Sequence, residues 1–178
     1  MKLLLHTCCG PCTMGTLKEL NRNEHDITAF WYNPNIHPYK EYEARLNSLK
    51  ELTSSIEMPV IIEDDYGLRD FVRMVVDDIN GRCINCYRDR LYATAKKAKE
   101  LGFDAFSTTL LVSPYQQHNR IKEEATKIGE EIGVPFFYVD PRPHFREGNR
   151  EAREQGLYMQ KYCGCVFSEE DRYRKQKK

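Results

Sequence analysis

The chain has 178 residues, a length that suits one domain, and 40% of them are hydrophobic, enough to build one core. The 27 basic and 27 acidic side chains balance, so bulk charge assigns neither an acidic nor a basic partner. The apolar run Lys2–Leu5 is too short for a membrane span or a signal peptide, so we expect a cytoplasmic protein without membrane contact.

Short apolar runs alternate with stretches of helical periodicity. The first half predicts a strand, a helix, a strand, a helix, a strand and a helix at Lys2–Thr7, Thr13–Asn21, Ile27–Tyr32, Tyr39–Leu52, Val60–Glu63 and Leu68–Ile79. The second half predicts a helix, a strand, a helix, a strand and a helix at Asn85–Leu101, Ala105–Thr109, Ile121–Ile132, Phe136–Val139 and Arg150–Tyr158. Ser168 and Asp171 resemble a capping box that opens a terminal helix.

Strands separated by helices predict an α/β fold with a mostly parallel sheet of about five strands and helices on both faces. We expect residues 1–178 to form a single domain with a flexible tail from about residue 172. Right-handed crossovers place the loops that follow the strands at one sheet edge, where ligands bind. The Cys8–Cys12 turn follows the first strand, so we expect it at that edge.

All seven cysteines fall in three short groups. These are His-Thr-Cys-Cys-Gly-Pro-Cys at 6–12, Cys-Ile-Asn-Cys at 83–86 and Cys-Gly-Cys at 163–165. Cytosolic thiols stay reduced, so the cysteines indicate chemistry rather than structural disulfides. The first two groups each begin a predicted helix, where free amides and the helix dipole favour thiolate over thiol. Thiolates are ligands for zinc and for iron–sulfur clusters.

The adjacent pair Cys8-Cys9 favours a cluster over zinc. Structural zinc sites commonly use cysteines spaced by two to four residues, and two neighbouring cysteines on one small tetrahedral ion would be strained. A cluster presents separate iron atoms and tolerates neighbouring ligands. We therefore predict a four-iron cluster held by Cys8, Cys9, Cys83 and Cys86. A zinc-stabilised binding module without catalysis is an alternative.

Three thiols remain outside this set. Cys12 lies about one helical turn after Cys8 and can face the same site as a further metal ligand, although its role stays open. Cys163 and Cys165 can form only a strained disulfide, and such bonds are easily reduced, which favours a redox dithiol. The other readings are that these three thiols bind a second metal, or that they only pack.

Polar residues follow the fourth predicted strand, at the expected ligand edge. Among them, His118 and Tyr115 are candidate proton donors, the alternative for His118 being a helix cap or a packed side chain. Tyr87, Arg88 and Arg90 follow the second cysteine group and could contact a phosphate and a base. Basic side chains concentrate near Arg82–Lys99 and Arg142–Lys178 and would contact a nucleic-acid backbone.

The three cysteine motifs together resemble the QueH family of epoxyqueuosine reductases. The motifs are His-Thr-Cys-Cys-Gly-Pro-Cys at 6–12, Arg-Cys-x-x-Cys-Tyr-x-x-Arg at 82–90 and Tyr-Cys-Gly-Cys-x-Phe-Ser at 162–168. The resemblance implies an α/β fold similar to that of adenine nucleotide α-hydrolases and PP-loop ATPases. It implies reduction of epoxyqueuosine in tRNA to queuosine, the final step of that pathway, without cobalamin.

The resemblance also implies site residues and partners. It implies a [4Fe-4S] cluster on Cys8, Cys9, Cys83 and Cys86, a redox pair at Cys163 and Cys165, and a further metal ion, iron, beside the cluster. The implied partners are the anticodon loop of tRNA and an external electron donor. Cys8–Cys12 replaces the phosphate-binding loop of the PP-loop enzymes, so ATP hydrolysis is not expected. An ATP-dependent, thiolation-type tRNA-modifying enzyme of PP-loop descent is the second alternative.

Overall fold

Four parallel strands form the centre of the computed structural model, which describes residues 1–174. The sheet order is β3-β2-β1-β4, with the strands at Val60–Ile62, Asp26–Trp31, Lys2–His6 and Ala105–Thr108 respectively. β1 pairs with both neighbours, Leu3 lying opposite Ile27 and Ala105. Leu3, Leu4 and Leu5 are fully buried, as expected of a strand covered on both faces.

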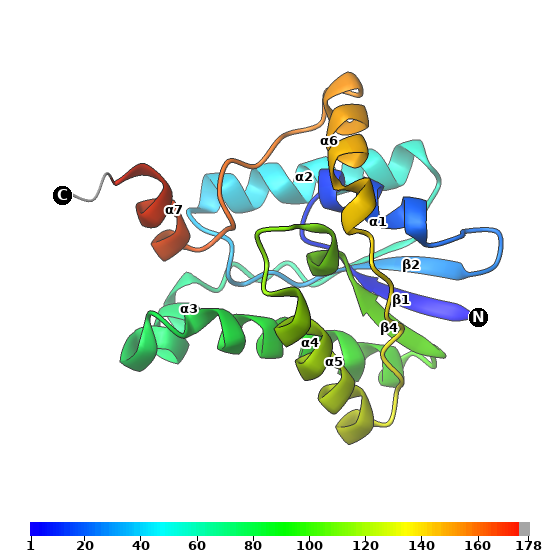
Figure 1. Cartoon of the computed structure of the whole chain (residues 1–178), viewed down its shortest axis with the longest axis horizontal. Helices are drawn as coiled ribbons and strands as arrows, with labels where there is room; N and C mark the ends of the chain where they lie inside the picture. The colour runs from blue at the N-terminus through cyan, green and yellow to red at the C-terminus, as the bar shows by residue number, and fades with distance from the viewer. Residues whose placement is uncertain (175–178) are drawn as a thin grey trace.

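Helices cover both faces of the sheet (Figure 1). One face carries α1, α2 and α6 at Gly10–Glu19, Tyr39–Ser55 and Phe145–Glu154, and the other carries α3, α4 and α5 at Leu68–Val75, Arg82–Glu100 and His118–Ile132. Short 3-10 turns η1, η2 and η3 lie at Val76–Asp78, Thr109–Val112 and Arg142–His144. This arrangement confirms the predicted α/β class. No helix within residues 1–174 is long and apolar enough to cross a membrane.

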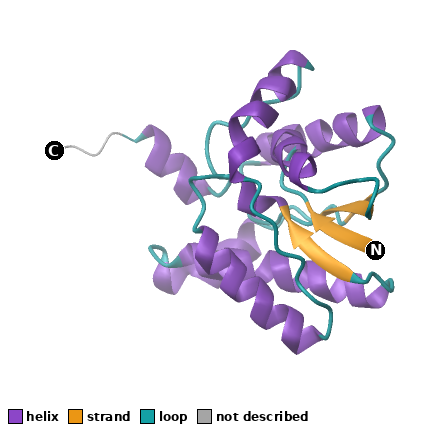
Figure 2. Cartoon of the chain, turned by 45° about the vertical axis from the view of Figure 1, so that its right-hand side comes forward, coloured by secondary structure: helices purple, strands orange, loops and turns teal. Residues whose placement is uncertain are grey.

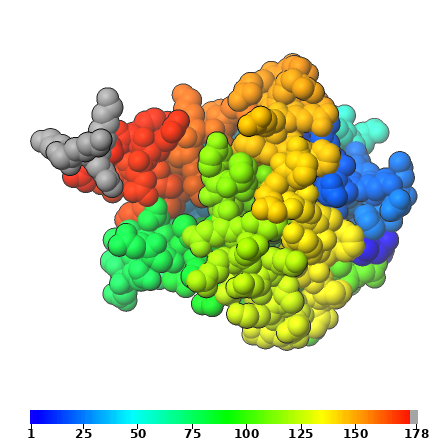
Figure 3. All heavy atoms as spheres, viewed as in Figure 1, coloured from blue at the N-terminus to red at the C-terminus, as the bar shows by residue number. Residues whose placement is uncertain are grey.

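The strands point toward the side of the molecule that carries α7, at Val166–Tyr173 (Figure 2). The loops after β1 and β4 and the third cysteine group therefore share this side. On the face shown in Figure 3, the light-green chain ahead of α5 lies between α6 and the orange-red stretch before α7. Segments far apart in sequence thus meet at the carboxyl edge of the sheet.

The predicted fifth strand is reduced to a single bridge between Phe106 and Phe136. The Phe137 amide donates to the Phe106 carbonyl at 2.8 Å, and no further ladder follows within the described residues. Pro135 and Pro141 flank this segment, and proline has no amide proton to extend a ladder. The sheet therefore has four strands rather than about five.

Several helix boundaries differ from the predictions, among them those of α4, α6 and α7. α4 begins at Arg82 rather than Asn85, so both cysteines of the second group lie within the helix. α6 ends at Glu154, shortly before Gly156, whose φ of +72° suits a chain leaving a helix. The N-cap of α7 is Cys165 rather than Ser168, and its thiol accepts from the Ser168 amide at 3.4 Å. α7 includes Arg172, while residues 175–178 of the predicted tail lie outside the described residues.

Candidate metal centre

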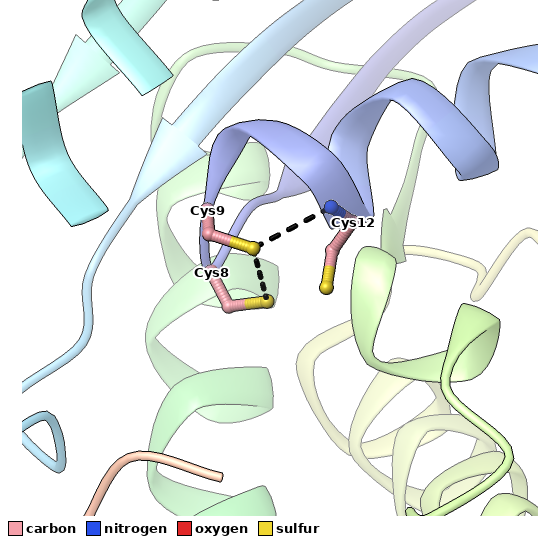
Figure 4. Close-up of side chains that lie close together, drawn as sticks. All are labelled: Cys8, Cys9 and Cys12. Atoms are coloured by element: carbon pink, nitrogen blue, oxygen red, sulfur yellow. Dashed lines mark hydrogen bonds between the residues drawn. The ribbon is translucent and has the colours of Figure 1, made fainter. Parts of the chain in front are cut away.

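The first cysteine group is formed by the start of α1, directly after β1. Cys9 is the N-cap, with extended backbone, and its sulfur accepts from the Cys12 amide at 3.4 Å (Figure 4). Cys8 and Cys9 place their sulfur atoms 3.9 Å apart, and the sulfur atoms of Cys8, Cys9 and Cys12 all lie within 4.8 Å of one another. All three side chains are buried. The local sequence therefore produces a compact triad of thiols.

The geometry of the triad weakens the expectation that Cys8 and Cys9 would be strained as ligands of one tetrahedral ion. With metal–sulfur bonds of about 2.3 Å, two thiolates on a tetrahedral ion lie about 3.8 Å apart. The 3.9 Å between Cys8 and Cys9 is close to this separation, so adjacency in sequence does not keep the two sulfur atoms apart. A thiolate metal site fits these residues, and the spacing of Cys8 and Cys9 does not by itself choose between an ion and a cluster.

Hydrogen bonds within the triad favour one thiolate. Contacts from Cys12 and then Cys9 hold the pKa of Cys8 well below its ordinary value, against the opposing effect of burial. The hydroxyl of Thr109, at the start of η2, donates to the Cys8 sulfur at 3.5 Å. The pKa of Cys12 is raised by its contacts with Cys8 and Cys9 and by burial. Negative charge therefore concentrates on Cys8.

The second and third cysteine groups are electrostatic neighbours. The pKa of Cys86 is raised to about 12, mainly by burial and in smaller part by the nearby Cys163 and Cys165, against the opposing charge of Arg90. Burial likewise raises the pKa of Cys83, with Cys163 as the next contributor. All seven cysteines are free thiols, so Cys163 and Cys165 do not form the predicted disulfide in this structure. The cluster set of Cys8, Cys9, Cys83 and Cys86 stays a prediction.

A pocket joins the first and third groups. Its lining includes Cys8, Cys12 and Cys163. The Gln116 side-chain amide donates to the Cys163 sulfur at 3.1 Å, and Cys163 is the exposed cysteine of the seven. The cavity has a volume of about 10 Å³, enough for about one water molecule, so thiols of both groups face one narrow space.

Arg45 on α2 fixes the position of the third group. Its side chain is fully buried and pairs with Glu41 at 2.8 Å. Its two terminal nitrogens donate to the carbonyls of Cys163 and Tyr162 at 2.7 and 2.8 Å. The Glu41 carboxylate also accepts from the Tyr158 hydroxyl. A compensated buried charge thus ties the Cys163 segment to α2.

Arg90 on α4 is buried without such a partner. Its guanidinium donates to the Cys86 sulfur and to the Cys86 carbonyl, both at 3.1 Å. In residues 1–174 no carboxylate forms an ion pair with it, although Asp89 contributes a field. The fields that act on Arg90 include those of Cys86, Cys163 and Cys8. A buried cation is costly unless it is compensated, so the site suits an anionic, thiolate-bound group.

The two proton-donor candidates lie outside the pocket lining. His118 begins α5, is buried, and lies with its Nε2 3.0 Å from the Tyr138 hydroxyl. Burial, followed by the charge of Arg142, lowers its pKa. Tyr115 is 88% exposed. Their roles as proton donors stay predictions.

The candidates for phosphate and base contact have internal partners. Tyr87 is buried and donates to the Gln116 side-chain oxygen at 2.7 Å. Arg88 pairs with Glu124 at 2.6 Å. Sequence reasoning missed Arg45, although its spacing of four residues from Glu41 on a predicted helix is a signal for an ion pair.

The fold and the site define an α/β protein with a buried group of thiols, suited to hold a metal, at the carboxyl edge of a parallel sheet. A sequence model of the family "Epoxyqueuosine reductase QueH" matches residues 3–171. The chain therefore belongs to the QueH family of epoxyqueuosine reductases, and it is an oxidoreductase.

Relatives with this name support the assignment. Epoxyqueuosine reductase QueH of Dehalococcoides mccartyi is 36% identical over 98% of this chain and 96% of its own length. The Thermotoga maritima protein is 35% identical over 93% and 89% respectively. The Helicobacter pylori protein is 35% identical, but the chain spans 49% of its length. A U34-tRNA thiolase, NcsA from Methanococcus maripaludis with its [4Fe-4S] cluster, is 11% identical, covers 93% of this chain and 76% of its own, and has a TM-score of 0.46, too low to support an argument.

Proposed function

We propose that this chain reduces epoxyqueuosine in tRNA to queuosine with a [4Fe-4S] cluster held by Cys8, Cys9, Cys83 and Cys86, without cobalamin. Family membership supports the reaction. The main structural support for the cluster is Arg90, a buried cation that contacts Cys86 and has no carboxylate ion-pair partner in the described residues. Cys12, within the same triad as Cys8 and Cys9, is the ligand available for a further iron ion beside the cluster.

The reaction removes one oxygen atom. Both carbon–oxygen bonds of the epoxide break, a carbon–carbon double bond forms, and the oxygen leaves as water, which takes two electrons and two protons. Oxidation of the Cys163–Cys165 dithiol to a disulfide supplies both. A bound cluster would supply one-electron transfer, by which an external donor would return two electrons, with two protons from solvent, to the Cys163–Cys165 disulfide.

The surrounding residues position this chemistry. Cys163 is exposed and lines the pocket, while Cys165, two residues later in the chain, is buried as the N-cap of α7. Arg45 holds the backbone of Cys163, and Gln116 orients its sulfur. We therefore assign Cys163 to the substrate side and Cys165 to the resolving side. His118 and Tyr115 stay candidates for delivering a proton through solvent.

The partners follow from the same reaction. The substrate is a nucleotide of the tRNA anticodon loop, where bases are already partly unstacked and accessible to a pocket. The electron donor is external to this chain. We propose a cytoplasmic location, because thiols stay reduced in that compartment and the proposed site needs reduced thiols.

Substitution of Cys83 tests the cluster assignment. After anaerobic reconstitution, we expect Cys83→Ala to lose iron, visible absorbance and turnover on epoxyqueuosine-containing tRNA. The matched variant Cys163→Ser should keep iron and absorbance but lose turnover. Retention of all three properties by Cys83→Ala would end the assignment.

A further inference from the structure

The loop between η2 and α5 presents a tyrosine to solvent without a packing reason. Tyr115 is 88% exposed, the most exposed of the large hydrophobic side chains in residues 1–174. Its ring makes an edge contact with Phe145, with ring centres 6.0 Å apart. The other face of the tyrosine is free to meet a ligand. An exposed aromatic ring contributes little to the free energy of folding, because its apolar surface stays in contact with water.

The base of this loop is held firmly from inside. The Tyr87 hydroxyl donates to the Gln116 side chain at 2.7 Å and accepts from the Gln117 amide at 3.2 Å. The Tyr115 amide donates to the Ser113 hydroxyl at 3.3 Å. Since Tyr87 is only 2% exposed, the loop is anchored to the core while its tip stays in solvent. The structure therefore presents Tyr115 on a preorganised support, which lowers the entropy cost of binding.

The tyrosine stands at the rim of the thiol pocket. Ser113 and Gln116, in the same loop, line the pocket, and Gln116 contacts Cys163. Across the rim, the pocket-lining Gln160 precedes the exposed Lys161. Arg146 is exposed and follows Phe145, the ring that Tyr115 touches. Neither Lys161 nor Arg146 forms an ion pair within residues 1–174. The rim of the pocket therefore combines the exposed ring of Tyr115 with two cations that have no carboxylate partner there.

This combination suits single-stranded RNA. A nucleotide that leaves its stack to enter a pocket exposes the face of the base next to it. An aromatic ring at the rim can replace the lost stacking partner, and nearby cations attract the phosphates. We propose that Tyr115 stacks on the base that flanks the target nucleotide in the RNA loop, with Lys161 at the adjoining phosphate. This inference rests on the proposed tRNA substrate, and it gives Tyr115 a binding role in addition to its candidacy as a proton donor.

Binding to RNA tests the inference without the metal. The probe is a fluorescein-labelled RNA hairpin with the loop sequence of a tRNA anticodon, titrated with the full chain and followed by anisotropy. Stacking on an aromatic side chain contributes about 1–3 kcal/mol per base, so Tyr115→Ala should weaken binding about 5- to 150-fold. Tyr115→Phe keeps the ring and should bind like the native chain. Tyr92→Ala, at a 43% exposed tyrosine of α4 outside the pocket lining, is the matched control and should have no effect.

Salt dependence separates stacking from phosphate contact. Lys161→Ala should lower the slope of log affinity against log salt by about one, and Tyr115→Ala should leave the slope unchanged. Native affinity in Tyr115→Ala, or equal losses in Tyr115→Ala and Tyr92→Ala, would overturn the inference. So would normal RNA binding by Tyr115→Ala with slower reduction by a protein electron donor, because the surface would then serve that protein.

The two proposals fail in different ways. Native protein that holds no iron and shows no turnover, with RNA binding still dependent on Tyr115, removes the reductase assignment and leaves the stacking surface. If the native protein is active and Tyr115→Ala binds RNA with native affinity, the stacking inference fails and the reductase assignment stands.

Discussion

At the scale of single residues, two buried arginines differ in how their charge is balanced. Arg45 has Glu41 as an ion-pair partner, whereas the hydrogen bonds of the Arg90 side chain within residues 1–174 go to the Cys86 sulfur and the Cys86 carbonyl. The charge of Arg45 is therefore balanced in the metal-free protein and in the metal-bound protein alike. Arg90 is expected to serve an anionic group on the thiols, since hydrogen bonds to sulfur and net charge set cluster potentials.

Replacement of Arg90 should therefore have opposite effects in the two states. In metal-free protein, Arg90→Met removes an uncompensated buried charge and should raise the free energy of unfolding, by about 1–4 kcal/mol, as replacing buried charges can. In reconstituted protein, it should make the midpoint potential more negative, because the reduced site loses a counter-charge. Urea unfolding and a spectroscopic redox titration measure the two effects. Arg90→Lys should shift the potential less, and an unshifted potential in Arg90→Met would refute the charge-balancing role.

His37 links pH to the position of the third cysteine group. Its Nδ1 accepts from the Val166 amide at 3.3 Å and its Nε2 lies 2.8 Å from the Pro34 carbonyl, so the buried ring is neutral. Burial lowers its pKa below 6.5. The unfolded chain takes up this proton first as pH falls, so the contribution of His37 to stability is complete above pH 6.5 and is lost as pH falls through the folded-state pKa.

This titration predicts the pH dependence of unfolding. The urea midpoint of the native chain should fall between about pH 7 and pH 5 more steeply than that of His37→Asn, which cannot titrate there. Parallel curves for the two proteins over this range would show that His37 does not contribute to the acid sensitivity.

At the scale of elements, α1 and α6 approach through glycine. A Cβ atom on Gly148 would lie 2.6 Å from the Cα atom of Gly15. Gly148→Ala should therefore force α6 away from α1 and lower the free energy of unfolding by about 1–3 kcal/mol, the usual cost of overpacking. Thermal unfolding measures the loss. Asn149→Ala, one residue along the same helix, is the control and should be nearly neutral; an equally mild Gly148→Ala would show that the two helices can separate at little cost.

The sequence predicted most strands and helices, but not the features that depend on contacts between elements. Hydrophobic runs predicted the four strands well, because a strand covered on both faces needs a continuous apolar sequence. They also predicted a fifth, because Phe136–Val139 has the same composition, yet neighbouring prolines limit it to one bridge. α6 was placed too late in the chain because Gly148 weakens a helix on propensity alone, whereas in the structure it permits the contact with Gly15.

Only the local part of the candidate site could be predicted, because its remaining features depend on tertiary contacts. Local chemistry was readable: adjacent cysteines at a helix start after a central strand indicated a thiolate site at the sheet edge. The grouping of thiols was not readable, because it depends on tertiary contacts of Arg45 and Gln116 with the Cys163 segment. Cysteine N-caps at Cys9 and Cys165 were also missed, since sulfur is outside the usual set of capping side chains.

At the scale of the whole molecule, the fold brings three distant segments to one edge. The start of α1, the start of α4 and the segment before α7 supply the seven cysteines, and α2 and the loop before α5 hold the third segment in place. A parallel sheet makes this convergence possible, because the loops after its strands all open on the same side. The proposed role of these converging thiols is to hold an iron–sulfur cluster.

Elemental and acid-labile sulfide analysis of protein prepared without oxygen tests that role most directly. We predict about four irons and four sulfides per chain, with about one more iron where the further ion at Cys12 is bound, and visible absorbance that bleaches on reduction. Zinc without sulfide in a colourless protein that still folds would contradict the account and identify the thiol centre as a structural metal site.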